Sequence, residues 1–137
     1  MEVKILLPFC FLIALTCGCR KIFDSGTSPD NSKTYKEEKP IIYIAVTSPL
    51  EGEKFIPGTQ LPIKWNSSPV LANVNIELYK KSDYIMTIVQ GNANDGAVLW
   101  TIPSDIRPSV HYKIKISNSN DENDFGYSNT FSILLSN

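Results

Sequence analysis

From residue 41 onward, hydrophobic and polar residues alternate in short runs that are separated by turn residues. Successive side chains of a β-strand point to opposite faces, so a period of two predicts strands with one buried face. The predicted strands are residues 41–47, 60–66, 73–80, 84–89, 97–102, 110–117 and 127–134. The residues expected to face inward are Leu61, Ile63, Trp65, Val74, Ile76, Leu78, Val98, Trp100, Ile102, Tyr112, Ile114, Ile116, Phe131 and Ile133.

About seven short strands with no amphipathic helix predict an all-β fold, in which two antiparallel sheets pack as a sandwich. The triplet Asn94-Asp95-Gly96 is typical of a hairpin turn, because these residues tolerate positive φ. Pro62 lacks a backbone N–H and therefore predicts an edge position or a strand start. Trp65 and Trp100 are the expected core anchors, because large aromatic side chains remove the most surface from water.

Several stretches resemble a known family in their order and spacing. They are residues 46–49, 63–65, 74–79, 94–96, 99–103, 112–116 and 127–133, together with Gly52, Phe55 and Gly58. The family is the Kre9/Knh1-like N-terminal domain, also called the Ser-Thr-rich GPI-anchored membrane protein family. The resemblance implies an immunoglobulin-like β-sandwich and a cell-surface setting. Fungal members are associated with cell-wall β-glucan assembly, bacterial members recur as modules of secreted and surface proteins, and no catalytic residues are carried over.

The N-terminus has the pattern of an export signal. Lys4 precedes an apolar run at 5–15, which is shorter than the roughly 20 residues of a membrane-spanning helix and fits a signal peptide. The following residues, 15–19, resemble a bacterial lipobox, in which a cysteine after a small residue receives a diacylglycerol and becomes the new N-terminus. Gly18 makes Cys19 the expected lipidation site, with Cys17 as the alternative cysteine. A plain secretory signal cleaved near Gly18 is the other alternative.

These features predict three segments. Residues 1–18 form a lipoprotein signal peptide, residues 19–40 a lipidated and flexible polar tether, and residues 41–137 the sandwich domain. Several acyl chains on Cys19 would hold the protein stably on a membrane, whereas one chain holds only marginally. Arg20, rather than the aspartate of an inner-membrane retention signal, follows Cys19. We therefore expect a cell-envelope protein at the outer membrane or cell surface.

The composition limits the kinds of partner and site that the protein can have. The formal net charge of the 137 residues is -1, which argues against a nucleic-acid partner, because such proteins need a clustered basic surface. All three cysteines, Cys10, Cys17 and Cys19, precede the domain, so it can hold neither a disulfide nor a cysteine zinc site. His111 is the single histidine, whereas metal sites and serine or cysteine nucleophiles usually recruit histidine. We therefore predict a protein that is not an enzyme and that uses no cofactor.

Three groups of residues are the remaining candidates for a site. The carboxylates of Glu51 and Glu53, and those within 121–124, are each local to one turn, whereas a glycosidase needs two carboxylates facing each other across a cleft. Oxygen ligands alternate in the loop 118–126 and make it a weak Ca²⁺ candidate, although a polar hairpin explains the loop equally well. Those ligands are Asn118, Asn120, Glu122 and Asp124. Tyr79 and Tyr84 face outward on adjacent strands, where they either contact a sugar ligand or pair across the strands.

The sequence thus predicts a membrane-anchored, non-catalytic module that binds polysaccharide or an envelope protein, or that has a structural role. Loops at the ends of the sandwich would carry specificity. The first alternative is an accessory subunit whose sheet edge pairs with a larger surface protein. The second is a glycan-active enzyme, which the lack of a recognisable acid–base pair disfavours.

Overall fold

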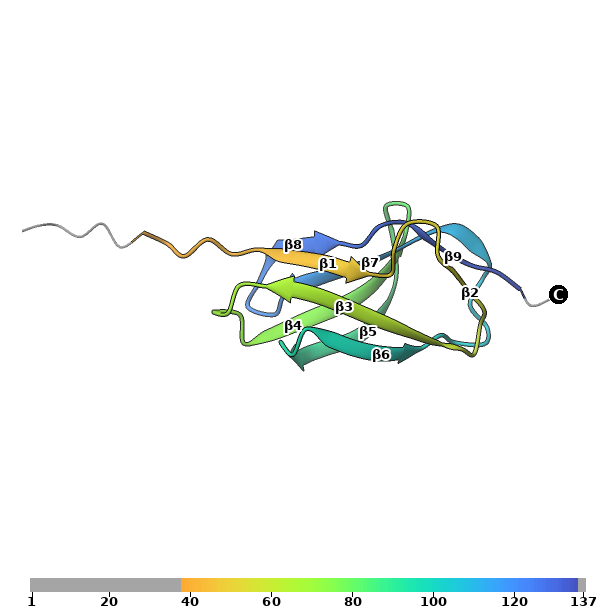
Figure 1. The fold of residues 1–137 in the computed structure, drawn as a ribbon, viewed down its shortest axis with the longest axis horizontal. Coiled ribbons are helices and arrows are strands. Elements are labelled where there is room, and N and C mark those ends of the chain that lie inside the picture. Colours follow the sequence, from red (N-terminus) through yellow and green to blue (C-terminus); the bar gives the residue numbers. More distant parts are fainter. Residues whose placement is uncertain (1–37, 136–137) are drawn as a thin grey trace, which may run out of the picture. The chain divides into compact units, whose positions relative to one another are not determined.

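The computed structural model describes residues 38–135, and all regular secondary structure in this part of the chain is β-strand (Figure 1). The strands are β1 (Ile44–Ser48), β2 (Lys54–Phe55), β3 (Gln60–Ser67), β4 (Asn73–Lys80), β5 (Asp83–Ala93), β6 (Ala97–Thr101), β7 (Ser109–Asn118), β8 (Asp121–Tyr127) and β9 (Phe131–Ile133). The predicted signal peptide, with Cys17 and Cys19, and nearly all of the predicted tether lie outside the described residues. Between residues 38 and 135 there is no helix with the length and hydropathy needed to cross a membrane.

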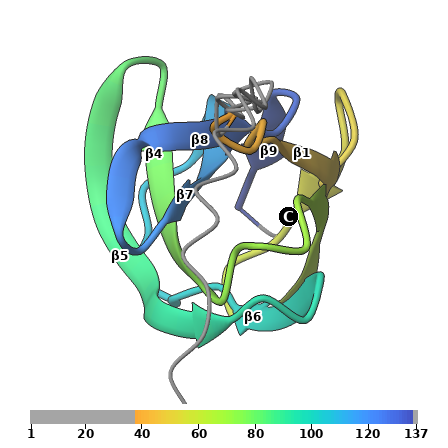
Figure 2. The ribbon, with the colours of Figure 1, turned by 90° about the vertical axis from the view of Figure 1, so that its left-hand side faces the viewer.

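The strands form two sheets that pack face to face (Figure 2). The smaller sheet has the order β1-β3-β6, and the larger has the order β2-β9-β7-β4-β5, with β8 also paired to β7. Every pair is antiparallel except β2 with β9, which is parallel. This arrangement confirms the predicted all-β sandwich.

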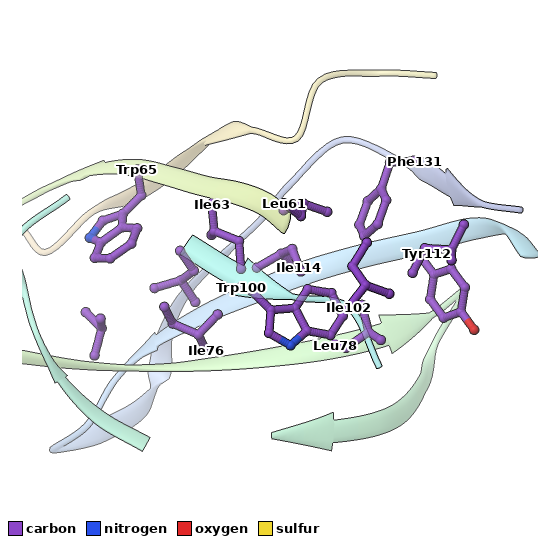
Figure 3. Close-up of a cluster of buried hydrophobic side chains, with 13 residues drawn as sticks. Leu61, Ile63, Trp65, Ile76, Leu78, Trp100, Ile102, Tyr112, Ile114 and Phe131 are labelled. Carbon is purple, nitrogen blue, oxygen red and sulfur yellow. The ribbon is translucent and has the colours of Figure 1, made fainter. Parts of the chain in front are cut away.

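The inward residues of both sheets form one continuous core (Figure 3). All of the residues predicted to face inward are buried, except Val98, which is half-buried and packs against the core. Trp65 lies near one end of this core and Tyr112 near the other (Figure 3). The alternating pattern therefore identified the buried face of each main strand, because in a strand that pattern follows directly from the pleat.

The structure has nine strands where the sequence predicted about seven. β2 is only two residues long, and the segment predicted as a loop at 118–126 contains most of β8. β8 is polar at its start and shows no apolar alternation there, so its pairing with β7, and not its own burial, defines it as a strand. The strand predicted at 127–134 is reduced to β9, because residues 128–130 interrupt the ladder. At this break, Ser128 Oγ accepts the backbone N–H of Ile114 at 2.9 Å.

The prediction of a hairpin at Asn94-Asp95-Gly96 is wrong. β5 and β6 belong to different sheets, so this turn carries the chain from one sheet to the other. The side chain of Asn94 fixes the crossing, since its Oδ1 accepts the indole N–H of Trp65 at 2.8 Å and its Nδ2 donates to the carbonyl of Leu71 at 2.9 Å. Gly96 has a φ of 82°, and its carbonyl accepts the backbone N–H of Trp65 at 2.9 Å.

Pro62 lies in β3, the central strand of the smaller sheet, and not on an edge strand. β1 pairs only with the part of β3 from Lys64 to Ser67, whereas β6 pairs alongside Pro62. The strand therefore has a neighbour on only one side at this residue. This local edge explains how the sheet accommodates a residue without a backbone N–H.

The two ends of the sandwich are formed by different segments of the chain. The segment that precedes β1 is bound at one end, where Ser68 Oγ accepts the N–H of Tyr43 at 2.8 Å and donates to the carbonyl of Ile41 at 3.0 Å. The β4–β5 turn and the connection from β6 to β7 lie at the other end, together with the C-terminal residues (Figure 1).

Candidate functional site

A row of aromatic rings, three of them exposed and one half-buried, crosses the solvent side of the larger sheet. It consists of Tyr84 on β5, Tyr79 on β4, and Phe125 and Tyr127 on β8, and we call these four residues the aromatic face. Ring centroids are 5.8 Å apart between Tyr79 and Tyr84, 5.8 Å between Tyr79 and Tyr127, and 5.5 Å between Phe125 and Tyr127, all edge to face. Tyr84, Phe125 and Tyr127 are 53%, 48% and 44% exposed. The rings therefore form one connected apolar surface that remains open to solvent.

Two lysines of β7 lie among these rings. Alternation along β7 turns Lys113 and Lys115 outward, between β4 and β8. The Lys115 ammonium lies 5.1 Å from the ring centroid of Phe125 and 5.7 Å from that of Tyr79, while Lys113 lies 5.9 Å from that of Tyr127. At such distances the cation is attracted by the electron-rich face of each ring. The two lysines therefore contact three of the four rings and add positive charge to the aromatic face.

Glu77 partly balances this charge. Its carboxylate lies 3.6 Å from the ammonium of Lys115 and accepts the hydroxyl of Tyr79 at 3.5 Å. Burial raises the pKa of Tyr79, and the negative charge of Glu77 raises it further against the opposing effect of Lys115. The Tyr79 hydroxyl therefore keeps its proton at neutral pH and can donate a hydrogen bond.

The structure places Tyr79 and Tyr84 directly opposite each other on β4 and β5. This confirms their predicted outward orientation and their pairing across the strands, and a ligand contact stays a prediction. Two rings of the aromatic face were not predicted: Phe125, because the segment 118–126 was interpreted as a loop, and Tyr127, because it was assigned to the strand predicted at 127–134. The signal was the triplet Phe125-Gly126-Tyr127, whose two rings share one face once the segment is a strand.

The candidate Ca²⁺ loop forms a tight hairpin between β7 and β8. Asn118 donates its amide to Asp124 at 3.3 Å and accepts the backbone N–H of Asn120 at 3.0 Å. Glu122 instead lines a small polar depression of about 80 Å³ that also includes Glu77. The four candidate ligands thus serve the hairpin and a neighbouring depression. Among residues 38–135, no three histidine, cysteine or acidic side chains are grouped so that they could hold a metal ion.

The other candidate carboxylates bond to nearby backbone groups. Glu53 accepts the N–H of Leu50 at 2.8 Å, and Glu51 accepts that of Thr130 at 3.2 Å. The backbone N–H and side-chain amide of Asn123 hold the pKa of Asp121 below its usual value. His111 is exposed. Glu53 thus stabilises its own turn, and Glu51 links that turn to the segment before β9.

Two mainly antiparallel sheets that pack face to face are the architecture of an immunoglobulin-like module. The chain belongs to the family of the Kre9/KNH-like N-terminal Ig-like domain, whose family model matches residues 48–133. The fibronectin(III)-like modules of CbhA from Clostridium thermocellum are similar in structure, with 17% sequence identity and a TM-score of 0.40 over 67% of this chain and 93% of that chain. A search of the curated proteins gives no match.

Proposed function

We propose that the protein is a membrane-anchored cell-envelope lipoprotein that binds polysaccharide through its aromatic face, without catalysis. The observation that carries the binding part of this proposal is the connected row of rings, of which Tyr84, Phe125 and Tyr127 are exposed. Sugar rings present apolar C–H faces that pack on aromatic side chains, and exposed apolar surfaces of this kind on a soluble domain mark binding sites. The lysines beside the rings add hydrogen-bond donors for hydroxyl or acidic groups of a glycan.

The anchoring part of the proposal rests on Cys19, and replacement of this residue tests it. In a bacterial host grown with a palmitate analogue, we expect the full chain to become labelled, because the lipobox-like sequence directs acylation. Cys19→Ser should abolish the label, whereas Cys17→Ser, the matched control two residues away, should retain it. Label that persists in Cys19→Ser, or an unlabelled native chain, would contradict the anchoring site.

The binding part is tested by removing two of the exposed rings. Tyr84→Ala combined with Phe125→Ala should weaken binding of the full chain to its polysaccharide by about tenfold or more, since each ring contributes contact area and stacking. The measurement is co-sedimentation with a panel of insoluble peptidoglycan, β-glucan and cellulose. Tyr43→Ala is the matched control, because Tyr43 is 52% exposed and lies outside the aromatic face. Equal losses for both variants would refute the assignment of this face.

A specific feature of β5 favours the alternative of an accessory subunit. β5 is the last strand of the larger sheet, and its residues from Tyr84 to Ala93 include neither a charge nor a proline. Natural edge strands usually carry such residues to prevent pairing with other chains, and an unprotected edge can accept a partner strand. No binding to any glycan, together with capture of an envelope protein from cell extract, would favour this role. Release of soluble sugar in the same assay would instead reveal a glycan-active enzyme.

A further inference from the structure

A cavity of about 370 Å³ lies at the end of the sandwich that carries the β4–β5 turn. Its walls come from the end of β4, the start of β5, the connection between β6 and β7, and the start of β7. The lining side chains are Ile85, Met86, Pro103 and Ile106, the ring of Tyr112, and the charged Lys80, Asp105 and Arg107. This volume lies within the range of pockets that hold small molecules, and a mainly apolar wall with a few polar groups is typical of them.

The wall of this cavity is held in place before any ligand binds. Tyr112 is buried, and its hydroxyl donates a hydrogen bond to the carbonyl of Arg107 at 2.5 Å. A tyrosine that bonds back to the backbone a few residues upstream fixes the corner between two strands of an immunoglobulin-like sandwich. Beside the cavity, the backbone N–H of Lys81, which follows Lys80, donates to the carbonyl of His111 at 2.9 Å. Both hydrogen bonds reduce the conformational entropy that would be lost on ligand binding, because the β6–β7 connection and the β4–β5 turn are already fixed.

The charges of the cavity favour an anion. Two cations, Lys80 and Arg107, and one carboxylate, Asp105, line it. Between residues 38 and 135, the one ion pair is that of Lys115 with Glu77, so none of the three charged groups of the cavity takes part in an ion pair there, and the two cations outnumber the one carboxylate. The positive charge of Arg107 acts on the Tyr112 hydroxyl and opposes the rise of its pKa caused by burial. An arginine beside an apolar wall can bind a carboxylate with two hydrogen bonds while the rest of the ligand packs on the wall.

We propose that this cavity binds a small carboxylate with an apolar body, and we call it the anion pocket. The carboxylate would be bound by Arg107 and Lys80, and the apolar body would pack on Met86 and Ile106. The anion pocket is independent of the aromatic face, so either site can fail without the other. It lies at the end of the sandwich away from the described segment that precedes β1.

The proposal is tested by methyl NMR of the full chain in detergent, titrated with 4-phenylbutyrate. We expect saturable shifts of the Met86 and Ile106 methyl groups. The neutral 4-phenylbutyramide should bind about tenfold more weakly or worse, because it lacks the charge that the two cations recognise. Inorganic phosphate should not reproduce the shifts, because it has no apolar body. Equal binding of acid and amide, or equal binding of phosphate, would overturn the proposal.

Substitutions in the anion pocket distinguish a loss of ligand recognition from a loss of folding. Arg107→Gln keeps the backbone carbonyl that Tyr112 uses and should weaken binding of 4-phenylbutyrate about tenfold, whereas Lys64→Gln, at an exposed position of β3, should leave it unchanged. Lys80→Gln provides a second variant with the same expected direction should Arg107→Gln fold poorly. Unchanged methyl signals from the core residues Ile114 and Ile116 report that each variant is folded. Native affinity in both glutamine variants would refute the anion pocket.

Discussion

Trp65→Ala is expected to lower the free energy of unfolding by about 3–5 kcal/mol, the usual range for truncating a large aromatic side chain in a core. Trp65 is 3% exposed and packs in the cluster shared by both sheets. Its indole N–H also donates to Asn94 Oδ1, which links β3 to the turn that crosses between the sheets. The substitution therefore leaves a cavity and removes a hydrogen bond that fixes this turn.

Two further variants are compared with Trp65→Ala in urea unfolding followed by circular dichroism of the full chain. Asn94→Ala keeps the ring but removes the acceptor of its N–H, together with the bonds of Asn94 to Ser67 and Leu71, which should cost about 1–3 kcal/mol. Leu99→Ala is the matched control on the neighbouring β6, because Leu99 is 57% exposed, and it should change stability by about 0.5 kcal/mol or less. Trp65→Ala with no larger effect than Leu99→Ala would show that the indole does not anchor this core.

The main strands could be predicted because the alternation that specifies each strand lies within its own residues. β4 was predicted as residues 73–80 and has those bounds, since its inward residues Val74, Ile76 and Leu78 alternate with polar or amphipathic neighbours. A buried face repeats every second residue whatever the partner strand, so the sequence reveals it without the topology. The two sheets and their core follow from the same pattern.

The connections could not be predicted in the same way. Turn residues such as Asn94 and Gly96 specify a local backbone conformation, but that conformation does not determine which sheet the next strand joins. Here the contacts of Asn94 with Trp65, 29 residues away, accompany the crossing. β8 is a similar case, because its strand conformation depends on pairing with β7 and its own residues show no buried face at the start.

In the candidate sites, too, local features could be predicted from the sequence, whereas contacts between strands could not. The outward orientation of Tyr79 and Tyr84 was readable from alternation on adjacent strands. Tyr127 reaches Tyr79 across β7, which pairs with both β4 and β8, and no spacing in the sequence reveals that neighbour. The anion pocket is likewise assembled from several segments, of which only the β4–β5 turn is local. Sites built across strands therefore required the topology before their residues could be grouped.

Gly126→Ala is expected to destabilise the fold by about 3 kcal/mol, at the upper end of the usual cost of overpacking. Gly126 lies on β8 in the larger sheet and faces the backbone of Ile44 on β1 in the smaller sheet. A methyl group at Gly126 would overlap the carbonyl oxygen of Ile44 and lie 3.0 Å from its carbonyl carbon. Both are backbone atoms, so no side-chain rotation relieves the overlap and β1 itself must shift. That shift opposes the pairing of Ile44 with Ser67 on β3.

Comparison with Gly91→Ala separates the effect of the steric overlap at Gly126 from the cost of backbone strain alone. Gly91 has a φ of 65°, but a methyl group there would meet nothing within 4 Å, so its replacement should cost about 1–2 kcal/mol from backbone strain alone. Urea unfolding should therefore rank Gly126→Ala as the more damaging variant. Hydrogen exchange should show faster exchange of the β1 amides in Gly126→Ala and not in Gly91→Ala, because only the first substitution displaces β1. Equal costs with undisturbed β1 amides would mean that the two sheets do not approach each other at this glycine.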